Sequence, residues 1–169
     1  ADVGYASNPQ PDDYEWGQGG AFMVESGRLE LSHSIIHNSD AALGGAVFGY
    51  RNAEISAEYC VFSQNMTTTG TIHVREESSA RFSHCLWDNN QVHHVGSAID
   101  AYDHTEVLVD NSVMRGGRHI SDTAGEVISV KKSSRTVLDH CLIVDNEVGE
   151  TAVIQGMTTL LTMIHCTVS

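Results

Sequence analysis

Apolar and polar residues along this chain follow a pattern that returns after about 26 residues. Each return opens with a short segment in which apolar residues alternate with other residue types. Alternation with a period of two places every second side chain on the same face of a β-strand. We therefore expect a series of stacked strands whose inward faces carry Phe22, Val47, Ile72, Ile99, Ile128 and Ile154.

Two further alternating segments follow in each repeat, after a polar turn. The second segment points apolar pairs such as Leu29 and Leu31 inward. The third points a small residue into the core, and this column contains Ser34, Cys60, Cys85, Ser112, Cys141 and Cys166. Repeats of this length with few helix signals are typical of solenoids. The sequence thus predicts an all-β fold, a right-handed parallel β-helix solenoid of about six coils, each with about three short strands.

The pattern divides the chain into two parts of very different length. Residues 19–169 carry the repeat and are expected to form the parallel β-helix, as a section of a longer protein. Residues 1–18 lack the repeat and contain Pro9, Pro11 and paired aspartates. This composition is typical of a linker or an irregular N-terminal cap.

Short motifs in the repeats resemble a known group of proteins. GGAF at residues 19–22, GGAV at 44–47 and FSQN at 62–65 resemble the paired motifs of polymorphic outer-membrane autotransporter passengers, within the right-handed parallel β-helix superfamily. Later repeats depart from this pattern, with RGG at residues 115–117 where FxxN is expected. ADVGY at residues 1–5 is similar to a segment of large secreted bacterial β-helix proteins. The resemblance implies an extracellular or cell-surface location.

Charge narrows the choice of partners. The chain has 9 basic and 22 acidic residues and a net charge of −13, which argues against nucleic acid and anionic membranes. The sequence contains no apolar run long enough to span a bilayer, so membrane insertion is not expected. No cofactor is expected; the acidity is compatible with calcium, but no ligand pattern supports that ion.

A column of bend residues precedes the small inward residues, and it contains His33, Tyr59, His84, Asn111, His140 and His165. Such a bend requires left-handed backbone angles, which Asn, Asp and His tolerate better than most residues. We expect a structural ladder here. The alternative is a metal site made by His140 and His165 on adjacent coils, for which the column itself supplies no third ligand. The cysteines are expected to be stacked free thiols, with a disulfide as the alternative.

In polysaccharide lyases and hydrolases of the β-helix superfamily, the resemblance places the active groove on the outward face of the first strand. The candidate ligand-binding residues on this face and its turn are Tyr50, His73, Arg75, Asp100, Tyr102, His104 and Lys131. If the protein is an enzyme, a base and a cation for an acidic sugar would come from Asp100, Asp103, Arg75 and Lys131. Asp100 with Asp103 is the candidate carboxylate pair of a hydrolase. The alternative is a solvated polar face without a ligand.

The outward column of the third strand is unusually apolar. It forms a hydrophobic stripe of Ile35, Val61, Leu86, Val113 and Leu142. A stripe of this kind is expected either to contact a partner or to be covered by the chain's own bends.

These observations favour a structural or adhesive segment of an extracellular or cell-surface β-helix protein: a stalk, passenger or filament subunit. Its expected partners are other segments of the same protein or copies of itself end to end, with polysaccharide as a candidate ligand. The alternative is a carbohydrate-active enzyme, a polysaccharide lyase or epimerase, with its groove on the first-strand face. Catalysis is the less favoured of the two, since the coils are few and only one long excursion could wall a groove.

Overall fold

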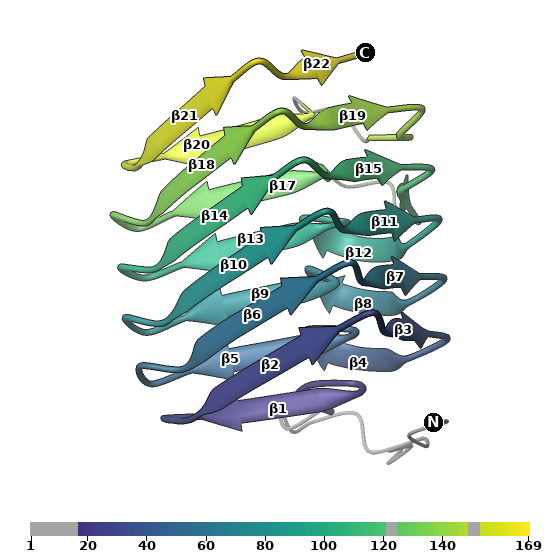
Figure 1. Cartoon of the computed structure of the whole chain (residues 1–169). Helices are drawn as coiled ribbons and strands as arrows, with labels where there is room; N and C mark the ends of the chain where they lie inside the picture. The colour runs from purple at the N-terminus through teal and green to yellow at the C-terminus, as the bar shows by residue number, and fades with distance from the viewer. Residues whose placement is uncertain (1–16, 121–124, 149–152) are drawn as a thin grey trace.

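The computed structural model describes residues 17–120, 125–148 and 153–169, which form an all-β parallel solenoid (Figure 1). In Figure 1, β2 (Arg28–Ser32) runs from left to right in front, and the chain returns behind it through β4 (Asp40–Leu43) while it climbs. This is the right-handed sense that parallel connections almost always take. The predicted linker or cap at residues 1–18 lies almost entirely outside the described residues, and pairing begins at Gln18, which bridges Leu43.

Strands of successive turns stack into four parallel sheets. The first sheet contains β1 (Phe22–Glu25), β5 (Val47–Tyr50), β9 (Ile72–Arg75), β13 (Ile99–Tyr102), β17 (Ile128–Lys131) and β20 (Ile154–Met157). The second contains β2, β6 (Glu54–Glu58), β10 (Ser79–Ser83), β14 (Glu106–Asp110), β18 (Arg135–Asp139) and β21 (Leu160–Ile164). The third contains β3 (Ile35–His37), β7 (Val61–Ser63), β11 (Leu86–Asp88), β15 (Val113–Arg115), β19 (Leu142–Val144) and β22 (Thr167–Val168).

The predicted columns are confirmed by the strand register. Phe22 pairs with Val47, Ile72 with Ile99, and the same alignment continues to Ile128 and Ile154. The described residues complete about five turns, slightly fewer than the six coils expected.

The prediction of three strands per coil is wrong for the first four turns, which have four. The fourth sheet contains β4, β8 (Met66–Thr69), β12 (Gln91–Val95) and β16 (Arg118–His119). These segments, such as DAAL and MTTT, are small or polar and show no apolar alternation, so the sequence pattern predicts bends there. They pair through backbone groups, which any non-proline residue supplies.

Apolar side chains from the first, second and third sheets fill one continuous core. Its widest part is aromatic: the ring of Phe62 stacks on that of Trp87 at 5.3 Å, and Phe82 meets Trp87 edge-on at 5.1 Å. Cys60, Cys85 and Cys141 are buried in the same core, and Cys166 is half-buried. All four cysteines are free, as expected, so stability comes from stacking rather than cross-linking.

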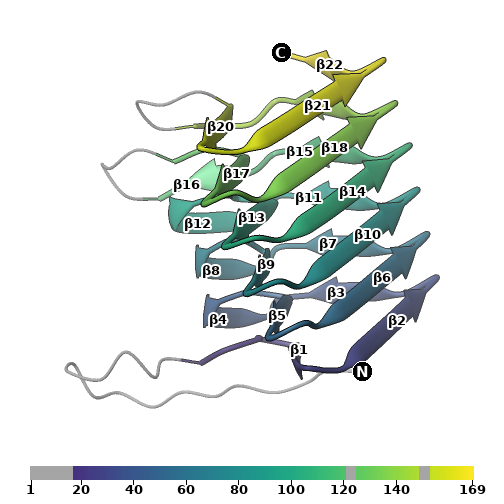
Figure 2. The same cartoon turned by 90° about the vertical axis from the view of Figure 1, so that its left-hand side faces the viewer.

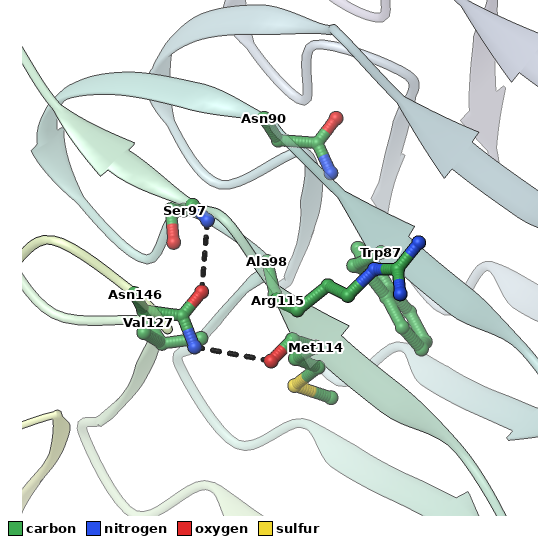
Figure 3. A pocket seen from close by; sticks show the side chains of 9 residues that line it. Trp87, Asn90, Ser97, Ala98, Met114, Arg115, Val127 and Asn146 are labelled. Carbon is green, nitrogen blue, oxygen red and sulfur yellow. Dashed lines mark hydrogen bonds between the residues drawn. The ribbon is translucent and has the colours of Figure 1, made fainter. Parts of the chain in front are cut away.

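The bends follow the predicted backbone chemistry. Every residue in the bend column before the small inward residue has a positive φ, between 48° and 53°: His33, Tyr59, His84, Asn111, His140 and His165. A second ladder of side-chain amides, from the buried Asn65 and Asn90 and the half-buried Asn146, bonds the bend after the third strand. Figure 3 shows Asn146, whose Nδ2 donates to the carbonyl of Met114 at 3.0 Å.

Gly117 interrupts this amide ladder in the fourth turn. Its N–H donates to Asn146 Oδ1 at 2.9 Å, but it has no side chain with which to contact Asn90 in the turn below. A Cβ at Gly117 would lie 2.5 Å from Ser97 Oγ, so the space left here is very tight. The hollow between Trp87, Asn90 and Asn146 (Figure 3) is too small to hold a water molecule and is not a ligand site.

Candidate functional site

The outward face of the first sheet is enclosed in its middle turns rather than open to solvent. Figure 2 shows the fourth sheet beside the first, and the chain turns sharply from one to the other. Gly70 and Gly96 lie in these turns with positive φ, and a Cβ on either would come within 3.2 Å of Asp100. In the outward column, Phe48, His73, Asp100 and Ser129 of the middle turns are at most 5% exposed, whereas Met23 in the first turn is 53% exposed and Gln155 in the last is half-buried. The sequence predicts a solvent-facing groove along this face, and packing against the adjoining turn explains why the middle turns are enclosed instead.

His73 and Asp100 form an ion pair within this enclosed column. His73 Nδ1 lies 2.8 Å from Asp100 Oδ2 and 3.3 Å from Thr69 Oγ1 of β8. The ring of Phe48 stacks on His73 at 5.3 Å and closes the pair from below. A buried imidazole next to a carboxylate is the arrangement that orients a general base.

Two oxygen atoms of the same column have no hydrogen-bond partner among the described residues. They are Asp100 Oδ1 and Ser129 Oγ, both buried. The stacking order is His73, Asp100, Ser129, because these residues pair on β9, β13 and β17. A nucleophile–base–orienter triad places the imidazole between hydroxyl and carboxylate. Here the carboxylate occupies the middle position, so Ser129 is not activated by His73.

Arg75 and Tyr50 lie at the end of the first-sheet strands and take part in a ladder of charges. Arg75 Nη2 contacts Glu76 Oε1 at 2.8 Å, and its guanidinium lies 5.9 Å from the centre of the Tyr50 ring. Tyr50 donates a hydrogen bond to Glu25, which also binds Arg51; these two bonds lower the pKa of Glu25, and the first raises the pKa of Tyr50. Both predicted ligand-binding residues therefore already have partners within the protein.

The other predicted residues are divided between two places. Lys131 Nζ lies 3.5 Å from Glu126 Oε1, a side chain only 1% exposed. Asp103 and His104 form an exposed pair at 3.0 Å in the bend after β13, and both have positive φ. Asp100 is enclosed whereas Asp103 is exposed in this bend.

Tyr102 ends β13 and lies against a lysine. Lys132 Nζ is 4.6 Å from the centre of the Tyr102 ring, and a hydrogen bond with Tyr102 raises the pKa of Lys132. Of the predicted residues, His73 and Asp100 form a buried pair. His104 and Asp103 form a second pair, which is exposed in the bend after β13.

Sequence reasoning missed Glu126, a buried carboxylate beside Lys131. A signal was available, because Glu126 stands in a column that otherwise contains small residues, such as Gly20, Gly45 and Ser97. Sequence reasoning also missed Thr69, which lies on the unpredicted fourth sheet.

The bend column forms a stack of rings on the outside of the solenoid. Tyr59 stacks between His33 at 5.1 Å and His84 at 4.7 Å, and the rings of His140 and His165 lie 4.6 Å apart. The predicted ladder is thus confirmed in geometry. The bend column by itself supplies no third ligand to accompany His140 and His165. Asp139 is not part of that column, but its carboxylate lies beside both rings.

The predicted hydrophobic stripe lies on the outer face of the third sheet. Ile35 is 65% exposed and Leu142 is 38% exposed, whereas Val61, Leu86 and Val113 between them are half-buried. The stripe is therefore exposed most at its two ends, and its role as an interface stays a prediction.

A broad open groove of about 550 Å³ runs over the outer face of the second sheet. Its polar lining includes Glu30, Glu58, Arg81 and Ser83, from β2, β6 and β10. This hollow lies on a different sheet from the predicted groove.

No protein-family model, curated protein or solved structure matches this chain. Within the described ranges, no helix is long and apolar enough to cross a bilayer. The fold, a parallel β-solenoid, is therefore the property by which this protein can be classified.

Proposed function

We propose that this chain is a rigid structural or adhesive segment of an extracellular or cell-surface β-solenoid protein. The observation that carries the proposal is the uninterrupted register of the first, second and third sheets, in which each strand pairs with its neighbour without a shift. Regular stacking of this kind produces a stiff rod whose length depends on the number of turns. The motif resemblance to polymorphic autotransporter passengers supports the location and the comparison with a passenger or stalk.

The side chains best suited to catalysis are buried in the protein, as side chains with a structural role are. The side chains of His73 and Asp100 are 7% and 4% exposed, and His73 Nδ1 is paired with Asp100 Oδ2. A catalytic base must come within hydrogen-bond reach of the proton that it removes. A buried pair covered by backbone does not meet this requirement without movement of the turns that contain Gly70 and Gly96, which supports the structural role.

The last described turn presents exposed apolar side chains, which suit a contact with a second copy of the solenoid. Met163 and Val168 are 40% and 42% exposed, whereas Leu138 and Ile143, their neighbours in the turn below, are fully buried. Burying the exposed two fifths of each side chain stabilises a contact by about 0.6–1.2 kcal/mol. The free edges of β20 to β22 offer backbone groups to a new strand as well.

End-to-end stacking is tested by the mass of the purified chain as a function of concentration, measured by analytical ultracentrifugation, together with electron microscopy. We expect concentration-dependent rods that disappear in the double variant Met163→Glu, Val168→Glu. The matched control is Gln91→Glu, which places a charge at an exposed position of β12 on the side of the rod, away from both ends. A chain that stays monomeric at every concentration, or rods that persist in the double variant, would refute the proposed stacking.

The unpartnered Asp100 Oδ1 favours one alternative, the carbohydrate-active enzyme. A screen for binding and depolymerisation of acidic polysaccharides tests it, with Asp100→Asn as the informative variant and Asp103→Asn, in the exposed bend, as its control. Activity that is lost in the first variant and kept in the second would establish the enzyme and displace the structural proposal. Absence of activity in all three proteins supports the structural role.

A further inference from the structure

Asp139, His140 and His165 form a compact group at the outer bend of the last two turns. Asp139 is the last residue of β18, His140 is the bend residue that follows it, and His165 is the equivalent bend residue one turn higher. Parallel stacking therefore brings together two imidazoles and a carboxylate that are separated by a whole turn of chain. This group takes no part in the proposed structural function.

The geometry points to a bound cation at its centre. One carboxylate oxygen, Asp139 Oδ1, lies 2.8 Å from His140 Nδ1 and 3.6 Å from His165 Nδ1. The same oxygen is shielded from solvent and accepts no hydrogen bond of good geometry within the described structure. A shielded carboxylate oxygen faced by two imidazole nitrogens, with no hydrogen bond to either, is suited to sharing a metal ion with them.

We propose that Asp139, His140 and His165 bind a divalent transition metal of the zinc type. Imidazole with carboxylate suits Zn²⁺ and its neighbours, whereas Ca²⁺ and Mg²⁺ prefer all-oxygen sets. Zinc bonds of about 2.0–2.2 Å in a tetrahedron place ligand atoms about 3.3 Å apart. The three ligand atoms lie within 4.8 Å of one another, so small side-chain rotations complete the site.

The site retains an open position. The His140 and His165 side chains are 56% and 69% exposed, so solvent reaches the metal from outside. Three protein ligands with a fourth position left for water or an incoming group is the arrangement of open zinc sites. A donor from another molecule could take that position, so the ion would join this bend to a neighbour.

The rest of the ladder shows why the site forms only here among the described turns. A site needs imidazoles on consecutive turns and a carboxylate immediately before one of them. His84 is preceded by Ser83 and lies between Tyr59 and Asn111 in the column, so it lacks both requirements. It has the same left-handed backbone, with φ of 53°, and is therefore a matched control.

Calorimetric titration of the purified chain with ZnCl₂ tests the proposal, with CaCl₂ in a parallel experiment. We expect one equivalent of zinc to bind, a higher thermal midpoint in its presence, and no binding of calcium. Asparagine already occupies this bend at Asn111, so His140→Asn and His165→Asn keep the backbone conformation. Each should weaken zinc binding by roughly tenfold or more, since even loss of an outer partner of a zinc ligand costs about that factor.

His84→Asn is the control and should leave zinc affinity unchanged. Because only neutral imidazoles bind zinc, affinity should also fall as the pH is lowered. The proposal is overturned if the unaltered chain binds no zinc, if calcium binds equally well, or if His84→Asn weakens binding as much as His140→Asn does. Circular dichroism of each variant confirms that the solenoid is intact.

Discussion

The amide ladder at the bend after the third strand gives a prediction whose size follows from its contacts. Asn65 is fully buried, and its Oδ1 accepts a hydrogen bond from the backbone N–H of Ser39 at 3.1 Å. Its Nδ2 donates to the carbonyl of Ile36 at 3.2 Å and to Asn90 Oδ1 at 3.0 Å. The substitution Asn65→Ala removes all three bonds at once.

The cost comes mainly from one backbone group left behind. Ser39 is buried, and its N–H loses the side-chain oxygen that accepts from it. The Ile36 carbonyl stays within the parallel ladder of β3 and β7, and Asn90 Oδ1 keeps the bond from the Asn65 backbone N–H at 3.0 Å, so both add little. Leaving one buried polar group unsatisfied costs about 1–3 kcal/mol, and we expect Asn65→Ala to lower the free energy of unfolding by about that amount.

Urea unfolding followed by circular dichroism measures this change, and hydrogen exchange at the Ser39 amide reports it locally. Gln91→Ala, an exposed position on β12, is the control and should change the free energy by no more than about 0.5 kcal/mol. A loss for Asn65→Ala no larger than that of the control, with slow exchange still seen at Ser39, would refute the reasoning. In a double-mutant cycle with Asn90→Ala, we expect a coupling of roughly 0.5–3 kcal/mol, because the two amides share a bond.

Three further perturbations test the core and the surface. Burial raises the pKa of the Cys85 and Cys141 thiols from 9.0 to about 11, so the folded chain holds these protons more tightly than the unfolded one and stability should fall as pH rises from 9 to 11. Urea midpoints across that range measure the fall, which Cys141→Ser should reduce; an equal fall in that variant would contradict the assignment. Phe82→Ala should cost about 3–5 kcal/mol in thermal or urea unfolding, and a cost below 1 kcal/mol would show that the aromatic core is loosely packed. Leu86→Lys with Leu142→Lys should lower the mass in solution if a partner covers the stripe; unchanged mass and stability would rule out a partner surface.

The sequence was sufficient for the inward columns and the bends. Period-two alternation identifies the core-facing residues of each strand without any knowledge of the turns around them, as Phe22 and Ile128 illustrate. The bend column was predictable for a different reason, because left-handed backbone angles restrict the residue type at positions such as His33 and Asn111. Both signals act through local chemistry that repeats once per turn.

The remaining features depend on packing that side-chain patterns do not record. The fourth sheet pairs through its backbone, so segments such as Met66–Thr69 show no alternation. Enclosure of His73 and Asp100 results from that sheet and from glycines that approach Asp100 closely. Asp139 lies outside the bend column, so a search along the column alone did not pair it with His140 and His165.

The way the turns are joined also determines how such a rod responds to force. The hydrogen bonds between turns run along the axis, and each set of them joins two short strands of neighbouring turns. No disulfide links the described turns. Tension applied along the axis should therefore peel off turns one after another instead of breaking the whole rod at once. Each detached turn would release about 26 residues, or roughly 90 Å of extended chain. A tether built in this way would absorb a sudden load by lengthening in steps.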